Sequence, residues 1–177
     1  IGKNSELHCL EFVVNDSKRN FFNNVYEDII LDDSAILKNI CLQNSKSSGY
    51  FHKYSKNKLS SQSSLTSFIF PTGLKFNKLD LEINLEGERS ECNLQSASFL
   101  NNNEHQEVKT RVNHLFPNCK SYQKVKNVLI ADSKGVYQGK IFVKDVAQKT
   151  DAYQLSKAIL LSEGSEFDSK PELEIYA

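Results

Sequence analysis

His114 and Cys119 are the two residues whose side-chain types and spacing first suggest chemistry. An imidazole that takes the proton of a thiol makes a reactive thiolate, and both groups also bind metal ions. The sequence does not show whether the two side chains meet, and burial or contact with a partner is the competing interpretation. We keep Cys119 and His114 as the metal candidates and expect no catalytic residue and no stably bound cofactor.

The segment from Gly135 to Lys140 resembles a phosphate-binding loop only in part. Three residues separate Gly135 from Gly139, and Ile141 stands where a Ser or Thr would bind magnesium. These glycines are better explained as tight-turn or close-packing positions between strands.

The remaining histidines and cysteines match no metal-binding spacing. A strand would place the neighbours His8 and Cys9 on opposite faces. His52, His105 and His114 would have to converge from distant parts of the chain. None of the four cysteines belongs to a Cys-x-x-Cys pair, so free thiols are expected, with two disulfides as the alternative.

Several carboxylates fall on alternating positions, which keeps open a paired acid and base of the kind that glycosidases use. Alternating acids are also normal on the exposed face of a strand, which is the interpretation we favour. The residues concerned are Glu82, Glu86, Glu88, Glu172 and Glu174.

The elements that must position these residues are short strands. Apolar residues alternate with polar ones, as in Leu79, Leu81 and Ile83, and such runs recur between clusters rich in Asn, Ser and Asp. Strands are expected at 7–14, 36–43, 50–54, 65–70, 79–85, 91–100, 108–114, 122–130, 136–143 and 173–176. The segment from Tyr153 to Leu161 is the one stretch that suggests a helix.

This pattern predicts an all-β fold. The chain has 7 Gly and 3 Pro and lacks the Asn-Gly and Asp-Gly dipeptides of tight hairpins, which argues against a sandwich or barrel. A β-solenoid, with turns made by Asn, Ser and Asp, accommodates this shortage. No strict repeat can be aligned, so its coils must be irregular.

Charge and length exclude some functions. The 22 basic and 22 acidic residues cancel, which disfavours nucleic-acid binding, even by the polar, aromatic-containing stretch 44–67. No apolar run approaches the roughly 20 residues of a membrane helix, and no secretory signal is visible. The 177 residues are expected to form one soluble domain.

The second half of the chain, from His114 to Ala177, resembles the SufB/SufD family of iron-sulfur cluster assembly proteins, and most closely its SufD branch. SufB proteins differ where this chain has His114 to Ser121. The matching residues are His114, Pro117, Cys119, Ser121, Lys124, Gly135, Gly139 to Ile141, Val143, Ala147 to Ala152, Leu160 to Ser162 and Lys170 to Ala177.

The resemblance implies a right-handed parallel β-helix over residues 1–177. In it, Val143 to Gln154 would be turn and strand positions with Val143, Val146 and Ala147 packed inward. Family members continue beyond the strand that resembles Glu172 to Ala177, into a Cys- and His-containing stretch, more β-helix and a helical C-terminal region. We therefore expect a fragment, or the ordered part, of a longer protein.

The function that the resemblance implies is that of a non-enzymatic scaffold subunit. It would pair with SufB through the β-helix and with the ATPase SufC through the C-terminal region, in the cytoplasm or a plastid stroma. The complex, rather than this segment, would assemble the iron-sulfur cluster. In isolation the segment has the means to form a homodimer. The alternatives are a carbohydrate-active β-solenoid enzyme and a structural or adhesion solenoid.

Overall fold

The computed structural model describes residues 1–15, 20–45 and 49–177. The described residues form twelve strands and no α-helix, which confirms the all-β prediction. No helix able to cross a bilayer is therefore found in this part of the chain. The strands are β1 (Glu6–Asn15), β2 (Phe22–Leu31), β3 (Ile36–Ser45), β4 (Tyr50–Leu59), β5 (Ser64–Thr72), β6 (Phe76–Leu85), β7 (Glu91–Leu100), β8 (His105–His114), β9 (Lys120–Leu129), β10 (Lys134–Val143), β11 (Asp151–Leu160) and β12 (Glu166–Ile175).

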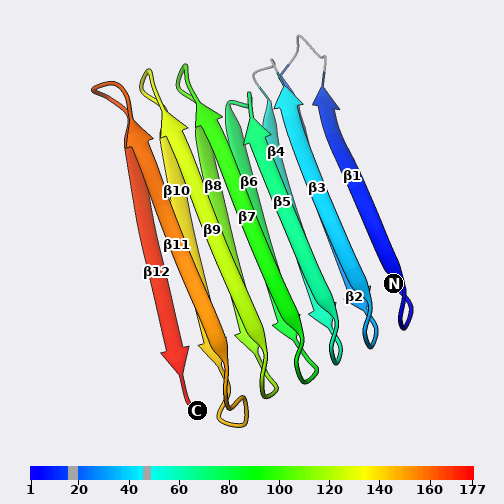
Figure 1. Ribbon diagram of the computed structural model, residues 1–177. Coiled ribbons are helices and arrows are strands. Elements are labelled where there is room, and N and C mark those ends of the chain that lie inside the picture. The colour runs from blue at the N-terminus through cyan, green and yellow to red at the C-terminus, as the bar shows by residue number, and fades with distance from the viewer. Residues whose placement is uncertain (16–19, 46–48) are drawn as a thin grey trace.

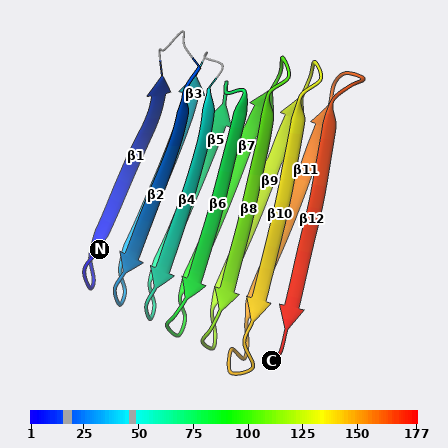
Figure 2. The ribbon, with the colours of Figure 1, turned by 180° about the vertical axis from the view of Figure 1, so that it is seen from behind.

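The strands build two parallel six-stranded sheets that face each other. Sheet A has the order β1-β3-β5-β7-β9-β11, and sheet B has the order β12-β10-β8-β6-β4-β2. In Figure 1 the odd strands run upward on the near side and the even strands run downward behind them, while the coils advance from right to left. Figure 2 shows the even strands in front. This winding is the expected right-handed parallel β-helix.

The coils differ in length, so the expected irregularity is confirmed. One coil advances 26 residues, from Tyr50 to its partner Phe76, whereas another advances 32 residues, from Lys134 to Glu166. The strands remain paired in register, so the difference in coil length lies in the turns.

Alternation along each strand separates a buried face from an outer face. In β4 every second residue from Phe51 to Leu59 is buried, and the residues between them are half-buried on the outside. The core between the sheets contains fully buried side chains such as Ile83, Leu85 and Tyr137. Burial of these side chains is the main driving force for stacking the coils.

One turn type recurs before the odd strands. A residue with positive φ stands two positions before each of β1, β3, β5, β7, β9 and β11, namely Asn4, Ser34, Gln62, Arg89, Asn118 and Lys149. In five of these turns the backbone N–H of that residue donates to a carbonyl in the turn of the next coil; for example, Ser34 N donates to Ser61 O at 2.9 Å. The residue that follows is small and fully buried in four coils, as Ala35, Ser63, Ser90 and Cys119. This turn is a structural repeat, although no strict repeat can be aligned in the sequence.

Two expectations from the sequence were wrong. The segment proposed as a helix, Tyr153 to Leu161, lies almost entirely in β11, because its backbone pairs with β9 along the whole strand. Val146 does not pack inward but is 51% exposed in the turn after β10. Val143 and Ala147 are buried as expected.

The solenoid is open at both described ends. β1 and β2 have neighbours on one side only, and so have β11 and β12. Inward-facing apolar side chains are therefore uncovered at the last coil, where Leu173 is 61% and Ile175 is 58% exposed.

Candidate functional site in the solenoid interior

The interior of the solenoid contains many polar side chains, which is unusual for a core. They lie on inward-facing positions of both sheets, so each must find hydrogen bonds inside the protein. The buried examples are Gln43, Lys53, Ser55, Asn57, Ser67, Asn77, Ser96, Ser98, Gln106, Thr110, Gln123 and Asn127.

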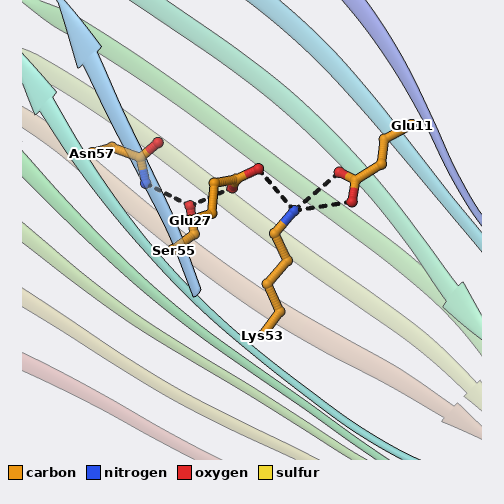
Figure 3. A network of polar contacts seen from close by, with 5 residues as sticks. All are labelled: Glu11, Glu27, Lys53, Ser55 and Asn57. Carbon is orange, nitrogen blue, oxygen red and sulfur yellow. Dashed lines mark hydrogen bonds and ion pairs between the residues drawn. The ribbon is translucent and has the colours of Figure 1, made fainter. Parts of the chain in front are cut away.

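The most highly charged part of this interior is a cluster around Lys53, at the end of the solenoid formed by β1 and β2 (Figure 3). Lys53 Nζ donates to both carboxylate oxygens of Glu11, at 3.2 and 3.0 Å, and lies 3.1 Å from Glu27 Oε1. Ser55 Oγ donates to Glu27 Oε2 at 2.7 Å, and Asn57 Nδ2 donates to Ser55 Oγ at 3.1 Å. The network thus joins sheet A, through β1, to two strands of sheet B.

Both partners are needed to keep this lysine charged. Burial alone would lower the pKa of Lys53, but the hydrogen bond with Glu11 and the charges of Glu27 and Glu11 outweigh that effect, so the pKa is raised. The Lys53 side chain is 7% exposed, whereas those of Glu11 and Glu27 are 30% and 29% exposed. The ammonium is therefore held inside while the carboxylates face the open end.

The thiols of Cys41 and Cys92 are not activated. Beside the cluster, burial reinforced by the negative charge of Glu11 raises the pKa of Cys41 to about 12. Cys92 lies in β7, away from the cluster, and burial alone raises its pKa to about 12. Cys41, Lys53 and Ser55 line a cavity of about 30 Å³ between the sheets. This volume is enough for a water molecule, and its walls offer polar partners.

Further along the interior, a second polar group surrounds Tyr137. Its Oη lies 3.2 Å from Thr110 Oγ1 and donates to Gln123 Oε1 at 3.4 Å. The amide of the neighbouring inward position Gln106 makes no hydrogen bond with the described residues. Such groups bind internal water in folded proteins.

The two metal candidates from the sequence lie in different surroundings. His114, the last residue of β8, is fully buried, and its Nε2 is 2.9 Å from Ser121 Oγ. Cys119 lies in the turn before β9, where Sγ donates to the carbonyl of Gly87 at 3.2 Å and is 3.4 Å from Ser90 Oγ. The two side chains share no hydrogen-bond partner, and the described residues contain no group of three or more metal-ligating side chains. Their role in metal contact stays a prediction.

The environment of His114 gives a testable pH dependence. Burial lowers its pKa to about 4, against a weaker opposing effect of Asp151, while the unfolded chain has a value of 6.5. Between pH 4 and pH 6.5 the unfolded state therefore binds more protons at His114 than the folded state does. We expect the contribution of the neutral, buried His114 to the free energy of unfolding to be complete above pH 6.5 and to be lost as the pH falls toward 4. Urea unfolding across this range measures it.

The variant His114→Gln is the control for this effect, because it removes the buried imidazole and leaves the other ionisable residues in place. The difference in unfolding free energy between the two proteins should change steadily from pH 6.5 to pH 4. A constant difference would show that His114 is not held neutral by its burial.

The other residues considered for chemistry do not converge. His52 pairs with Asp80 at 3.0 Å and His105 with Glu107 at 3.2 Å on the outer face of sheet B, whereas His114 lies inside. On sheet A, His8 contacts Glu6 at 2.7 Å. The sheet itself thus separates His114 from the other two histidines named as a metal set.

Of the carboxylates considered as an acid and base pair, Glu82 and Glu172 are held in the charged form by their neighbours. Tyr54 Oη donates to Glu82 at 2.7 Å and lowers the pKa of that carboxyl, and Lys170 lowers the pKa of Glu172. Lys140 pairs with Glu174 at 2.7 Å. A general acid needs a raised pKa, so these interactions favour the interpretation as outer-face ion pairs.

The polar stretch 44–67 is largely strand. Residues 46–48 lie outside the described residues, and the rest includes β4 and the first part of β5. The sequence reasoning missed that Lys53 lies in the core. The available signal was its place between Phe51 and Ser55, at an inward position of an alternating strand.

Comparison with known proteins agrees with this architecture. The family model described as "SUF system FeS cluster assembly, SufBD core domain" matches residues 1–177. The iron-sulfur cluster assembly protein SufD of Escherichia coli is 33% identical over 93 residues, which are 52% of this chain and 22% of that protein. A SufBD family protein of Synechocystis is 23% identical over 157 residues, which are 89% of this chain and 35% of that protein.

A SufBD family protein of Mycobacterium bovis is 28% identical over 96 residues, which are 50% of this chain and 24% of that protein. The chain thus matches between about a fifth and about a third of the length of these three relatives. The family model covers the whole chain, and the two-sheet solenoid is the fold that the resemblance implied. The chain belongs to the SufB/SufD family of iron-sulfur cluster assembly proteins, as a core domain of that family.

Proposed function

We propose that this chain is the β-helix of a SufD-type scaffold subunit that pairs with SufB and, through regions outside these 177 residues, with the ATPase SufC. The family match and the similarity to the Escherichia coli SufD protein support this proposal. The complex assembles the iron-sulfur cluster, and this subunit contributes shape and interface without catalysis or a stably bound cofactor. Its compartment is the cytoplasm or a plastid stroma.

The observation that carries the proposal is the match of the SufBD core domain model to the whole solenoid, residues 1–177. The described solenoid finishes in two edge strands, β11 and β12. Each edge strand presents unpaired backbone N–H and C=O groups, which pair readily with a strand of another chain. The inward-facing side chains of the last coil add exposed apolar area, as Leu160, Leu173 and Ile175 are 50%, 61% and 58% exposed. A second β-helix placed here would continue both sheets and cover these side chains.

The opposite end is less suited to pairing of this kind. Glu11 and Glu27 lie in the interior there, and they would be desolvated under a partner. Of the two described ends, the one formed by β11 and β12 is therefore the better suited to further strand pairing. The Gly135 to Lys140 segment is part of β10 and forms no phosphate-binding loop, in keeping with hydrolysis of ATP by a separate subunit.

The test is co-expression of this chain with SufB and SufC of the same genome, followed by size-exclusion chromatography with light scattering. We expect a stable mixed complex. Deletion of this β-helix from the full-length protein should abolish the complex, because the proposal gives the β-helix the contact with SufB.

If the chain elutes alone at micromolar concentration with both partners present, the assembly role is wrong, and binding to polysaccharide becomes the next measurement.

A further inference from the structure

The outer face of β7, β9 and β11 carries a distinct surface. Parallel pairing places their outward side chains in rows across the three strands. We call four of these rows the lysine face; they are Asn93, Tyr122 and Tyr153, then Gln95, Lys124 and Leu155, then Ala97, Lys126 and Lys157, and finally Phe99, Val128 and Ile159.

The central rows of the lysine face hold positive charge without a counter-charge. Lys126 and Lys157 are register partners on adjacent strands, and Lys124 lies one row away on the same face. Within the described part of the chain none of the three makes an ion pair. Like charges directly opposite each other destabilise a sheet, so this arrangement carries a cost in the free chain.

On sheet B, by contrast, some outward lysines contact carboxylates. There Lys134 contacts Glu166 at 3.1 Å and Asp168 at 3.3 Å, and Lys140 contacts Glu174 at 2.7 Å. At the lower border of the lysine face itself, Lys120 contacts Glu91 at 3.3 Å. Several lysines on the sheets are thus paired with carboxylates on adjacent strands. Lys56 and Lys109 on sheet B make no ion pair among the described residues, but they have Glu82 and Asp80 as register partners. Lys124, Lys126 and Lys157 have no carboxylate as a register partner.

Aromatic and apolar side chains border the charges on both sides. The rings of Tyr122 and Tyr153 stack at 4.8 Å between centroids, and Lys124 lies over the Tyr122 ring at 5.2 Å. In the last row Phe99 is 41% and Ile159 is 58% exposed. The face therefore offers apolar contact on either side of a cationic centre.

We propose that the lysine face binds an acidic, extended segment of a partner protein, with carboxylates on alternate residues followed by an aromatic or apolar side chain. Alternate residues of an extended chain are separated by about 7 Å, the spacing of successive rows on these strands. Carboxylates would neutralise Lys124, Lys126 and Lys157, and the terminal apolar side chain would cover Phe99 or Ile159.

A protein segment fits this face better than nucleic acid does. The chain has no net positive charge, and three lysines supply a small electrostatic term compared with the phosphate contacts of nucleic-acid-binding proteins. The site uses outward side chains, whereas strand pairing at the β11 edge would use backbone groups. Its success or failure is therefore independent of that pairing.

The experiment titrates the 177-residue chain into a fluorescein-labelled peptide, Ser-Glu-Thr-Glu-Thr-Phe-Ser, at low ionic strength, and follows fluorescence anisotropy. We expect saturable binding. The triple variant K124Q/K126Q/K157Q should weaken it about tenfold, and the single variant K157Q, at an exposed position, should weaken it by less.

The control K56Q/K58Q/K109Q removes the same charge from the outer face of sheet B and should change the affinity by less than about twofold. An equal loss of affinity in the control would show that binding depends only on overall charge, and would overturn the proposal. So would the absence of binding at millimolar peptide, or tighter binding of an oligouridine of equal charge that depends on the same three lysines.

Discussion

Replacement of Gly87 by alanine is expected to lower the free energy of unfolding by about 3 kcal/mol or more. Gly87 lies in the turn between β6 and β7, stacked on the turn of the previous coil. A Cβ atom there would overlap the backbone of Ser60 and Ser61, which has no flexible side chain to move aside. The two coils would have to separate at this turn.

The same displacement would remove further bonds. The Gly87 carbonyl accepts hydrogen bonds from Ser90 Oγ at 2.8 Å and from Cys119 Sγ at 3.2 Å. Urea unfolding followed by circular dichroism measures the loss. Gly2→Ala is the matched control, since the nearest atom to its Cβ would be Ser5 Oγ at 3.9 Å. Equal stability of the two variants would contradict the stacking of the turns described above.

The second large effect is expected for Lys53→Met, which should destabilise the protein by about 3 kcal/mol. The substitution leaves the carboxylates of Glu11 and Glu27 without their shared cation inside the solenoid. The expected loss lies at the lower end of the range for broken buried ion pairs, because both carboxylates keep roughly a third of their exposure. Urea unfolding at pH 7 is the measurement.

Two further variants separate charge from packing. Lys56→Met, on the outer face of the same strand, should change stability by less than about 0.5 kcal/mol. Adding Glu11→Gln and Glu27→Gln to Lys53→Met should restore much of the loss, because the unpaired charges are then gone. If the triple variant is no more stable than Lys53→Met, the ion pairs do not account for the effect.

The alternating strands were predictable because one of their faces is buried. In β6 Asp80 and Glu82 lie on the outer face and Leu79, Leu81 and Ile83 on the inner face, and the expected boundaries lie within a few residues of the observed ones. β2 was missed because Phe22, Tyr26 and Ile30 make its outer face as apolar as its inner one. Without a difference between faces, alternation gives no signal.

β11 was taken for a helix for a related reason. Its apolar residues Leu155, Ala158 and Ile159 follow the spacing of an amphipathic helix. The segment forms a strand because it pairs with β9, about thirty positions earlier in the chain. The local sequence does not indicate this pairing.

The candidate site was less predictable than the fold. The sequence singled out Cys119 and His114, which are residues of unusual chemistry, whereas the structure draws attention to a lysine and two glutamates. Glu11, Glu27 and Lys53 belong to three strands, and only the stacking of the first two coils brings them together. A buried lysine is visible in the sequence, but its partners are not.

The turns before the odd strands have a consequence for how the chain is built during synthesis. The backbone N–H of Asn4 donates to the carbonyl of Asp33, that of Ser34 to Ser61, and that of Gln62 to Glu88. In each of these bonds the donor is translated before its acceptor. A nascent chain can pair its strands as it emerges from the ribosome, but each of these turns becomes fully hydrogen-bonded only after the next coil has formed.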